Sequence, residues 1–141
     1  MSPKLKTALT QSPREWAVLL HAFSLFFVIS AGLALASLPR VRRLLRVERA
    51  QRRRSVLGPE IIARQVDRAA RCYPFRVVCL QRSLCLEHLL RFYGFPASFR
   101  LGVRRQDEEL EAHAWVECHG RPIAEGPNLA SFQPMERASA P

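Results

Sequence analysis

The sequence predicts an α+β domain in which helices precede a small antiparallel sheet, and two patterns carry this prediction. Apolar residues recur near a 3.6-residue period over 59–72 and again from Cys79 to Gly94, which indicates two amphipathic helices. Apolar residues then alternate over 95–103, and two further strand-like segments, 112–117 and 121–126, flank a turn with a glycine. Helices followed by strands are typical of an α+β layout.

Length and composition favour one folded domain with a basic segment before it. The 141 residues are 48% hydrophobic and 9% aromatic, which is typical of a folded chain. Residues 1–57 carry eleven Lys/Arg against two acids, a net +9, whereas residues 58–141 carry eleven against ten, a net +1. We therefore expect an anchor or docking segment over 1–57, made of an apolar and a basic helix, and a globular domain over 58–141. Nucleic acid is not the expected partner.

The segment from Trp16 to Pro39 contains no charged residue and is long enough to cross a bilayer. It is either a membrane-associated helix or the most buried helix of the domain, and the sequence leaves both interpretations open. A secretory signal is disfavoured because eight arginines follow between residues 40 and 54. Membrane association through residues 16–54 would place the protein in the cytoplasm, at the inner face of the membrane. The arginine block is either an amphipathic helix at a lipid or protein surface or a plain solvated face, and it has no aromatic residues for stacking on RNA bases.

The elements of the C-terminal part follow from local signals. Gly58-Pro59 opens the first helix, Tyr73-Pro74 ends it, and Gly94 is placed to cap the second. After the strand that ends at Val103, we expect an acidic loop over 106–111, a hairpin that turns at 118–120, and an extended tail after Gly126.

Four cysteines, at positions 72, 79, 85 and 118, show no CxxC pair and no disulfide framework, so we expect reduced thiols. Cys79 stands at a predicted helix start, where the partial positive charge of unpaired backbone N–H groups favours the thiolate. Cys72 and Cys85 are interpreted as small packing residues. The spacing of cysteines and histidines matches no usual zinc pattern, and neither a metal nor a cofactor is expected.

A nucleophilic thiol needs a proton carrier, and His113 in the strand 112–117 is the best candidate. His88 lies too far along the helix of Cys79, and His119 is expected at the hairpin tip. Glu125 on the returning strand would orient His113 if the hairpin loop has three residues, 118–120. A two-residue loop would place Glu125 opposite Ala114, on the other face. Cysteine, histidine and acid in this order are typical of papain-like and transglutaminase-like thiol chemistry.

Two segments, CLQRSLCLEHLLRFYGFPASFRLGV (79–103) and AHAWVECHGRPIAE (112–125), resemble lasso-peptide B2 proteins. These are leader peptidases of the transglutaminase-like superfamily, related to the microcin J25 processing protein. The resemblance runs from about Ile61 to Gln133. It implies a transglutaminase- or papain-like cysteine protease fold, with Cys79 as nucleophile and His113 as base. Family members usually carry aspartate where this chain has Glu125.

The resemblance also implies partners and an activity. The enzyme would remove the leader from a ribosomally made precursor peptide, with a separate leader-recognition protein and an ATP-dependent lasso cyclase as partners. Two alternatives stay open: a non-catalytic adaptor that binds the precursor or the cyclase, and an acyl transferase that uses the same residues without hydrolysis.

Overall fold

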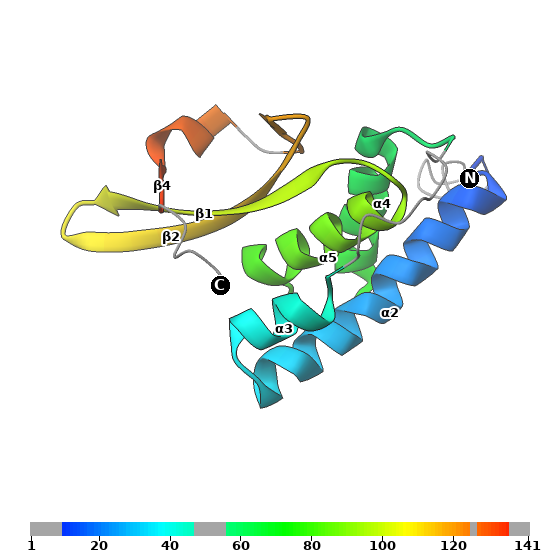
Figure 1. The fold of residues 1–141 in the computed structure, drawn as a ribbon, viewed down its shortest axis with the longest axis horizontal. Helices are drawn as coiled ribbons and strands as arrows, with labels where there is room; N and C mark the ends of the chain where they lie inside the picture. Colours follow the sequence, from blue (N-terminus) through cyan, green and yellow to red (C-terminus); the bar gives the residue numbers. More distant parts are fainter. Residues whose placement is uncertain (1–9, 47–55, 125–126, 136–141) are drawn as a thin grey trace, which may run out of the picture.

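The computed structural model describes residues 10–46, 56–124 and 127–135, and within these ranges the α-helices pack on one side of a sheet (Figure 1). The helices are α2 (Pro13–Leu35), α3 (Leu38–Leu44), α4 (Pro59–Cys72), α5 (Cys79–Phe92) and the short 3-10 helix η1 (Pro127–Ser131). The strands are β1 (Ala97–Gln106), β2 (Glu109–Cys118), β3 (Arg121–Pro122) and β4 (Gln133–Pro134). The predicted α+β fold is confirmed.

The helix ends follow from local chemistry. The Ser12 hydroxyl accepts from the N–H of Glu15, and the Glu15 carboxylate accepts from the N–H of Ser12, which together form a capping box for α2. Pro59 opens α4 at its first turn, as predicted. Gly94 has φ +90° after the end of α5, a conformation that glycine adopts without strain and that confirms the predicted cap.

The sheet is antiparallel in the order β3-β2-β1-β4. β1 and β2 form a long hairpin whose paired residues include Gly102 with His113 and Gln106 with Glu109. The predicted acidic loop over 106–111 is wrong, because these residues complete the two strands around a tight turn with Asp107 at φ +56°. Asp tolerates this left-handed conformation better than most residues.

The second hairpin corrects a further expectation. Cys118 pairs with Arg121, so the turn contains only His119 and Gly120, with φ of +53° and +76°. Two positive φ values are the requirement of a type I′ turn, whose twist matches that of the strands. The three-residue loop that would set His113 opposite Glu125 is therefore wrong. Strand β3 is also short, and the backbone just after it is left-handed at Ala124, with φ +55°.

The tail after Gly126 is not simply extended. It forms η1 and then β4, which pairs with β1 at Gly102 and Val103. In Figure 1, η1 and β4 lie on the side of the β1–β2 hairpin that faces away from the helices.

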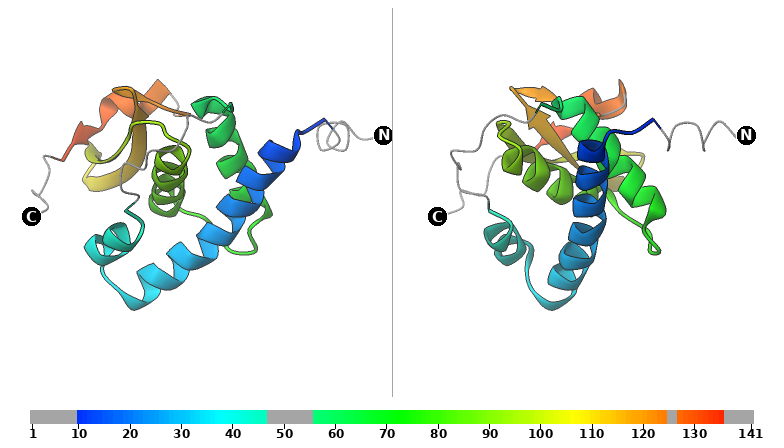
Figure 2. Two further views of the ribbon diagram at one scale, coloured as in Figure 1. Left: turned by 45° about the vertical axis from the view of Figure 1, so that its right-hand side comes forward. Right: turned by 90° about the vertical axis from the view of Figure 1, so that its right-hand side faces the viewer.

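Helices α2, α4 and α5 pack against one another (Figure 2), and one hydrophobic core joins them to the sheet. From α2 it includes five buried residues, Val18, Ala22, Leu25, Phe26 and Ile29. Helix α2 therefore packs in the same core as the helices after residue 58. Of the two interpretations that the sequence allowed, a buried helix and a membrane-associated helix, the first is correct for one face of α2. Of the basic segment, residues 47–55 lie outside the described ranges.

If α2 is part of the core, Ile29→Ala will destabilise the protein much more than the neighbouring Val28→Ala. Ile29 is fully buried, and removing its side chain should lower the free energy of unfolding by about 2–5 kcal/mol. Val28 is 60% exposed, so its substitution should change that free energy by less than about 0.5 kcal/mol. Chemical denaturation followed by circular dichroism measures both, and equal effects would contradict the packing of α2.

Candidate active site

Cys79 is the first residue of α5, as the sequence predicted. The cap residue before it, Val78, offers no side-chain acceptor, and the Gln81 side chain instead accepts from the N–H of Val78 at 3.1 Å. The first N–H groups of a helix have no partner within the helix. The N-terminus of α5 thus presents partial positive charge and hydrogen-bond donors beside a partly exposed thiol.

A repeating set of hydrogen bonds fixes α5 along the β1–β2 hairpin. Arg91 donates to the carbonyl of Ala97 at 2.9 Å, and Glu87 accepts from the N–H of Phe99 at 3.2 Å. The fully buried Ser83 hydroxyl then donates to the carbonyl of Ala114 at 2.9 Å. Since Ala114 pairs with residue 101 of β1, each helical turn advances two residues along the hairpin.

This repeat sets the start of α5 at about the same level along β2 as residues 112–114. One further turn of helix rises about 6 Å, and two strand residues span roughly 6.8 Å. The step from Ser83 back to Cys79 therefore reaches the level of Ala112, with His113 between Ala112 and Ala114. Cys79 and His113 lie at the same end of the α5–β2 pair.

The alternation of β2 decides the direction of the His113 ring. Val116 and Cys118 belong to the core under the helices, whereas His113 and Trp115 lie on the other face. The His113 ring stacks on Trp115 with centroids 6.2 Å apart and contacts Phe132 after η1 at 5.2 Å. The imidazole thus lies against two aromatic rings, those of Trp115 and Phe132.

Glycine at position 102 makes room for this arrangement. Gly102 pairs with His113, and a Cβ at this position would lie only 2.7 Å from the six-membered ring of Trp115. No side chain can be added there without moving the indole, which is 3% exposed. The packing of the Trp115 ring across β1 therefore explains the glycine in the segment LGV (101–103).

Glu125 itself lies outside the described residues, but the residue before it is anchored. Arg82 binds the Asp67 carboxylate at 2.6 Å and donates to the carbonyl of Ala124 at 3.2 Å. The same side chain therefore joins α4, α5 and the segment after β3. Ala124 leaves the regular strand conformation, so counting along the ladder no longer gives the face of the residue that follows.

The other three cysteines are poorly suited to nucleophilic chemistry. Cys85 is fully buried, and burial raises the pKa of its thiol strongly, which confirms a packing role. Burial, and then the charge of Glu60, raise the pKa of Cys118. Cys72 is exposed rather than packed, which corrects the expected packing role, and as the last residue of α4 it has no helix N-terminus beside it.

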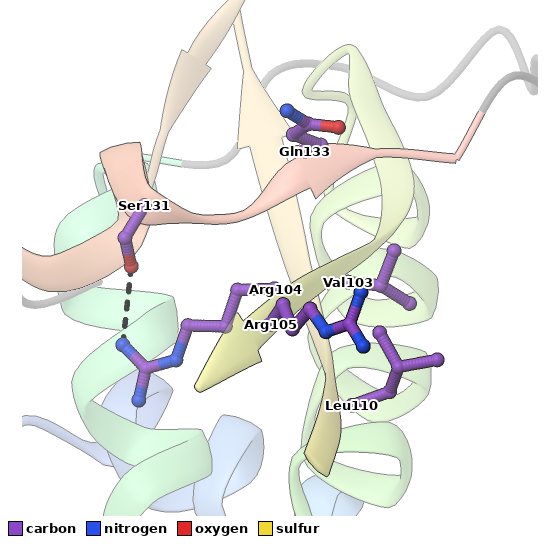
Figure 3. Close-up of a pocket in the computed structure, with 6 residues that line it drawn as sticks. All are labelled: Val103, Arg104, Arg105, Leu110, Ser131 and Gln133. Atoms are coloured by element: carbon purple, nitrogen blue, oxygen red, sulfur yellow. Dashed lines mark hydrogen bonds between the residues drawn. The ribbon is translucent and has the colours of Figure 1, made fainter. Parts of the chain in front are cut away.

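Two other kinds of site find little support in the described part of the chain. No three His, Cys, Asp or Glu side chains gather there in a way that could hold a metal ion. An open pocket of about 360 Å³ lies near the tip of the β1–β2 hairpin (Figure 3). Arg104 turns toward Ser131 and Arg105 toward Leu110, so the two guanidinium groups do not converge on one ligand.

Sequence reasoning missed two residues beside His113, namely Gly102 and Phe132. Gly102 carried a detectable signal, because an isolated glycine in a strand often marks the close approach of another group. Phe132 carried none, since its segment is rich in Pro, Asn and Ser and is far from His113 in sequence.

The profile of the transglutaminase-like superfamily matches residues 25–137. This range begins within α2 and includes the elements around Cys79 and His113. No curated protein and no solved structure matches the chain.

The bond between Ser83 and Ala114 can be tested with a matched pair of serines. Ser83→Ala leaves a buried carbonyl without its donor and should lower the free energy of unfolding by about 1–3 kcal/mol. Ser24→Ala removes a hydroxyl that bonds the Leu20 carbonyl at 2.9 Å on the exposed face of α2, and should be close to neutral. Urea denaturation compares the two, and a neutral Ser83→Ala would show that this bond does not hold α5 in place.

Proposed function

Since the chain belongs to the transglutaminase-like superfamily, we propose that it is a cysteine peptidase with Cys79 as nucleophile and His113 as general base. The observation that carries the proposal is the position of Cys79 at the open N-terminus of α5, one turn before the serine that bonds the carbonyl next to His113. A thiol in this position has the favourable local charge that an activated nucleophile needs. The base that it also needs is assigned to His113, whose imidazole would have to turn from the outer face of β2 toward the start of α5.

The reaction proceeds through an acyl-enzyme. The Cys79 thiolate attacks the scissile carbonyl carbon, and backbone N–H groups at the start of α5 stabilise the oxyanion. Protonated His113 donates its proton to the departing amine as the C–N bond breaks. His113 then takes a proton from water, which attacks the thioester and releases the acid product and the thiolate. Both protons pass through the same imidazole.

Glu125 is proposed as the group that orients His113. On a regular strand the two-residue turn would place Glu125 opposite Ala114, but the left-handed backbone at Ala124 interrupts that alternation. The order of cysteine, histidine and acid along the chain is what supports the role. A carboxylate that accepts from the second ring nitrogen would select the tautomer in which the first can accept the thiol proton. The extra methylene relative to aspartate requires a different rotamer or backbone path.

The substrate proposed is the precursor of a lasso peptide, from which the enzyme removes the leader. The resemblance of residues 79–103 and 112–125 to B2 proteins supports this choice. Exposed Phe75 and Val78 precede Cys79 and offer apolar contacts to an extended peptide. A separate recognition protein would bring the leader, and an ATP-dependent cyclase would use the released core peptide, in the cytoplasm.

The first test uses the precursor peptide whose gene lies beside the gene of this protein. The peptide is incubated with the recognition protein and either the native protein or a variant, and the products are analysed by mass spectrometry. We expect the native protein to remove the leader and Cys79→Ala to remove none, because the nucleophile is lost. Cys72→Ala, which removes an exposed thiol with no proposed role, should process the peptide at the native rate.

Equal processing by the native protein and Cys79→Ala would rule out thiol catalysis. If neither protein cleaves the peptide but both bind it, the non-catalytic adaptor becomes the better account. Transfer of the acyl group to an added amine, with little hydrolysis, would instead identify an acyl transferase.

The roles proposed for His113 and Glu125 predict effects of different size on kcat. His113→Ala removes the base and should lower kcat by at least about 10²-fold. Glu125→Gln should lower kcat less, while Glu125→Asp, which keeps the charge, should retain most of the activity. Steady-state kinetics of leader removal, with folding checked by circular dichroism, measures all three. An active His113→Ala would contradict the assigned base, and a fully active Glu125→Gln would contradict the orienting role.

A further inference from the structure

Helix α2 carries a second apolar face that no other described element covers. Trp16, Leu20, Phe27, Val28 and Leu35 are between 41% and 87% exposed, and they recur along one side of the helix. Ala17, Ser24, Ala31 and Ala34 fill the spaces between them and are also exposed. Figures 1 and 2 show α2 along the outer edge of the molecule.

This face contains no charge over its whole length. From Trp16 to Leu35 the helix extends about 30 Å at roughly 1.5 Å per residue. Its most polar exposed side chain, Ser24, already donates to the carbonyl of Leu20 at 2.9 Å within the same helix. No side chain on this face therefore needs water as a hydrogen-bond partner.

The inner face decides how α2 can meet a membrane. By length and composition α2 could cross a bilayer. However, Val18, Ala22, Phe26 and Ile29 are fully buried against α4 and α5, and a spanning orientation would remove them from the core. The helix can keep its core contacts only if it lies in the plane of the surface.

Positive charge borders the exposed face at both ends. Arg14 precedes it, and the exposed side chains of Arg40, Arg43 and Arg46 follow within α3 and just after it. Leu44, 81% exposed, adds a further apolar side chain among these arginines. An uncharged face with arginines at its ends complements an anionic bilayer, which offers acyl chains beside negative headgroups.

We propose that α2 binds the surface of an anionic membrane in the plane of the bilayer, with its outer face in the headgroup region and its inner face in the protein core. Trp16 and Phe27 would lie at the depth that aromatic side chains prefer. The long arginine side chains would reach the phosphates while their aliphatic parts remain near the apolar region. The proposal does not depend on the peptidase activity.

The test is sedimentation of the full chain with vesicles of phosphatidylcholine alone or mixed with phosphatidylglycerol. We expect binding to the anionic vesicles, release by high salt or by alkaline carbonate, and little binding to phosphatidylcholine alone. The double variant Leu20→Glu with Val28→Glu changes only exposed positions and should bind at least about tenfold more weakly. Arg40→Glu with Arg43→Glu should also weaken binding and reduce its dependence on salt.

The matched control is Leu110→Glu at the tip of the β1–β2 hairpin, which is 76% exposed and far along the chain from α2. It should bind vesicles like the native protein, and circular dichroism should show that all variants remain folded. Unchanged binding by the Leu20 and Val28 double variant, or no binding by the native chain, would overturn the proposal. Resistance of the bound protein to carbonate would instead indicate a spanning helix and would also overturn it.

Discussion

The arrangement of this molecule depends on one buried hydrogen bond, from the Ser83 hydroxyl to the carbonyl of Ala114. A buried hydroxyl or carbonyl without a partner costs about 1–3 kcal/mol, so the two groups strongly favour a single alignment of α5 and β2. This alignment sets Cys79 one turn before the contact and His113 one residue before it. Arg82, the neighbour of Ser83, bonds Ala124 and extends the same constraint to the segment after β3. The motif RSL therefore aligns three parts of the candidate site.

The outer face of the sheet supplies the second constraint. His113, Trp115 and Phe132 form one aromatic group, and Gly102 leaves the space that the indole occupies. The indole N–H is buried with no acceptor among the described residues. Aromatic packing thus takes precedence over hydrogen bonding at Trp115, and it limits the rotation of the imidazole. The imidazole of His113 is therefore held in a fixed orientation on the outer face of the sheet.

Helix α2 explains why the apolar N-terminal segment was ambiguous. A helix that is apolar on all sides is usually buried in a protein or in a membrane. In this structure Phe26 faces the core and Val28 faces outward, so the same segment has one face of each kind. Hydropathy alone does not separate the two faces, because both consist of the same residue types. The superfamily match, which begins at residue 25, includes the second half of this helix.

The sequence by itself determined the helices α4 and α5, the cap at Gly94 and the position of Cys79 at a helix start, because caps and helical periodicity are local signals. It also determined the order of the main strands. Only the tertiary structure decided the two-residue turn at His119 and Gly120, the 3-10 helix in the tail and the aromatic surroundings of His113. These features depend on left-handed backbone at non-glycine residues and on contacts between distant segments. Neither leaves a periodic pattern in the chain.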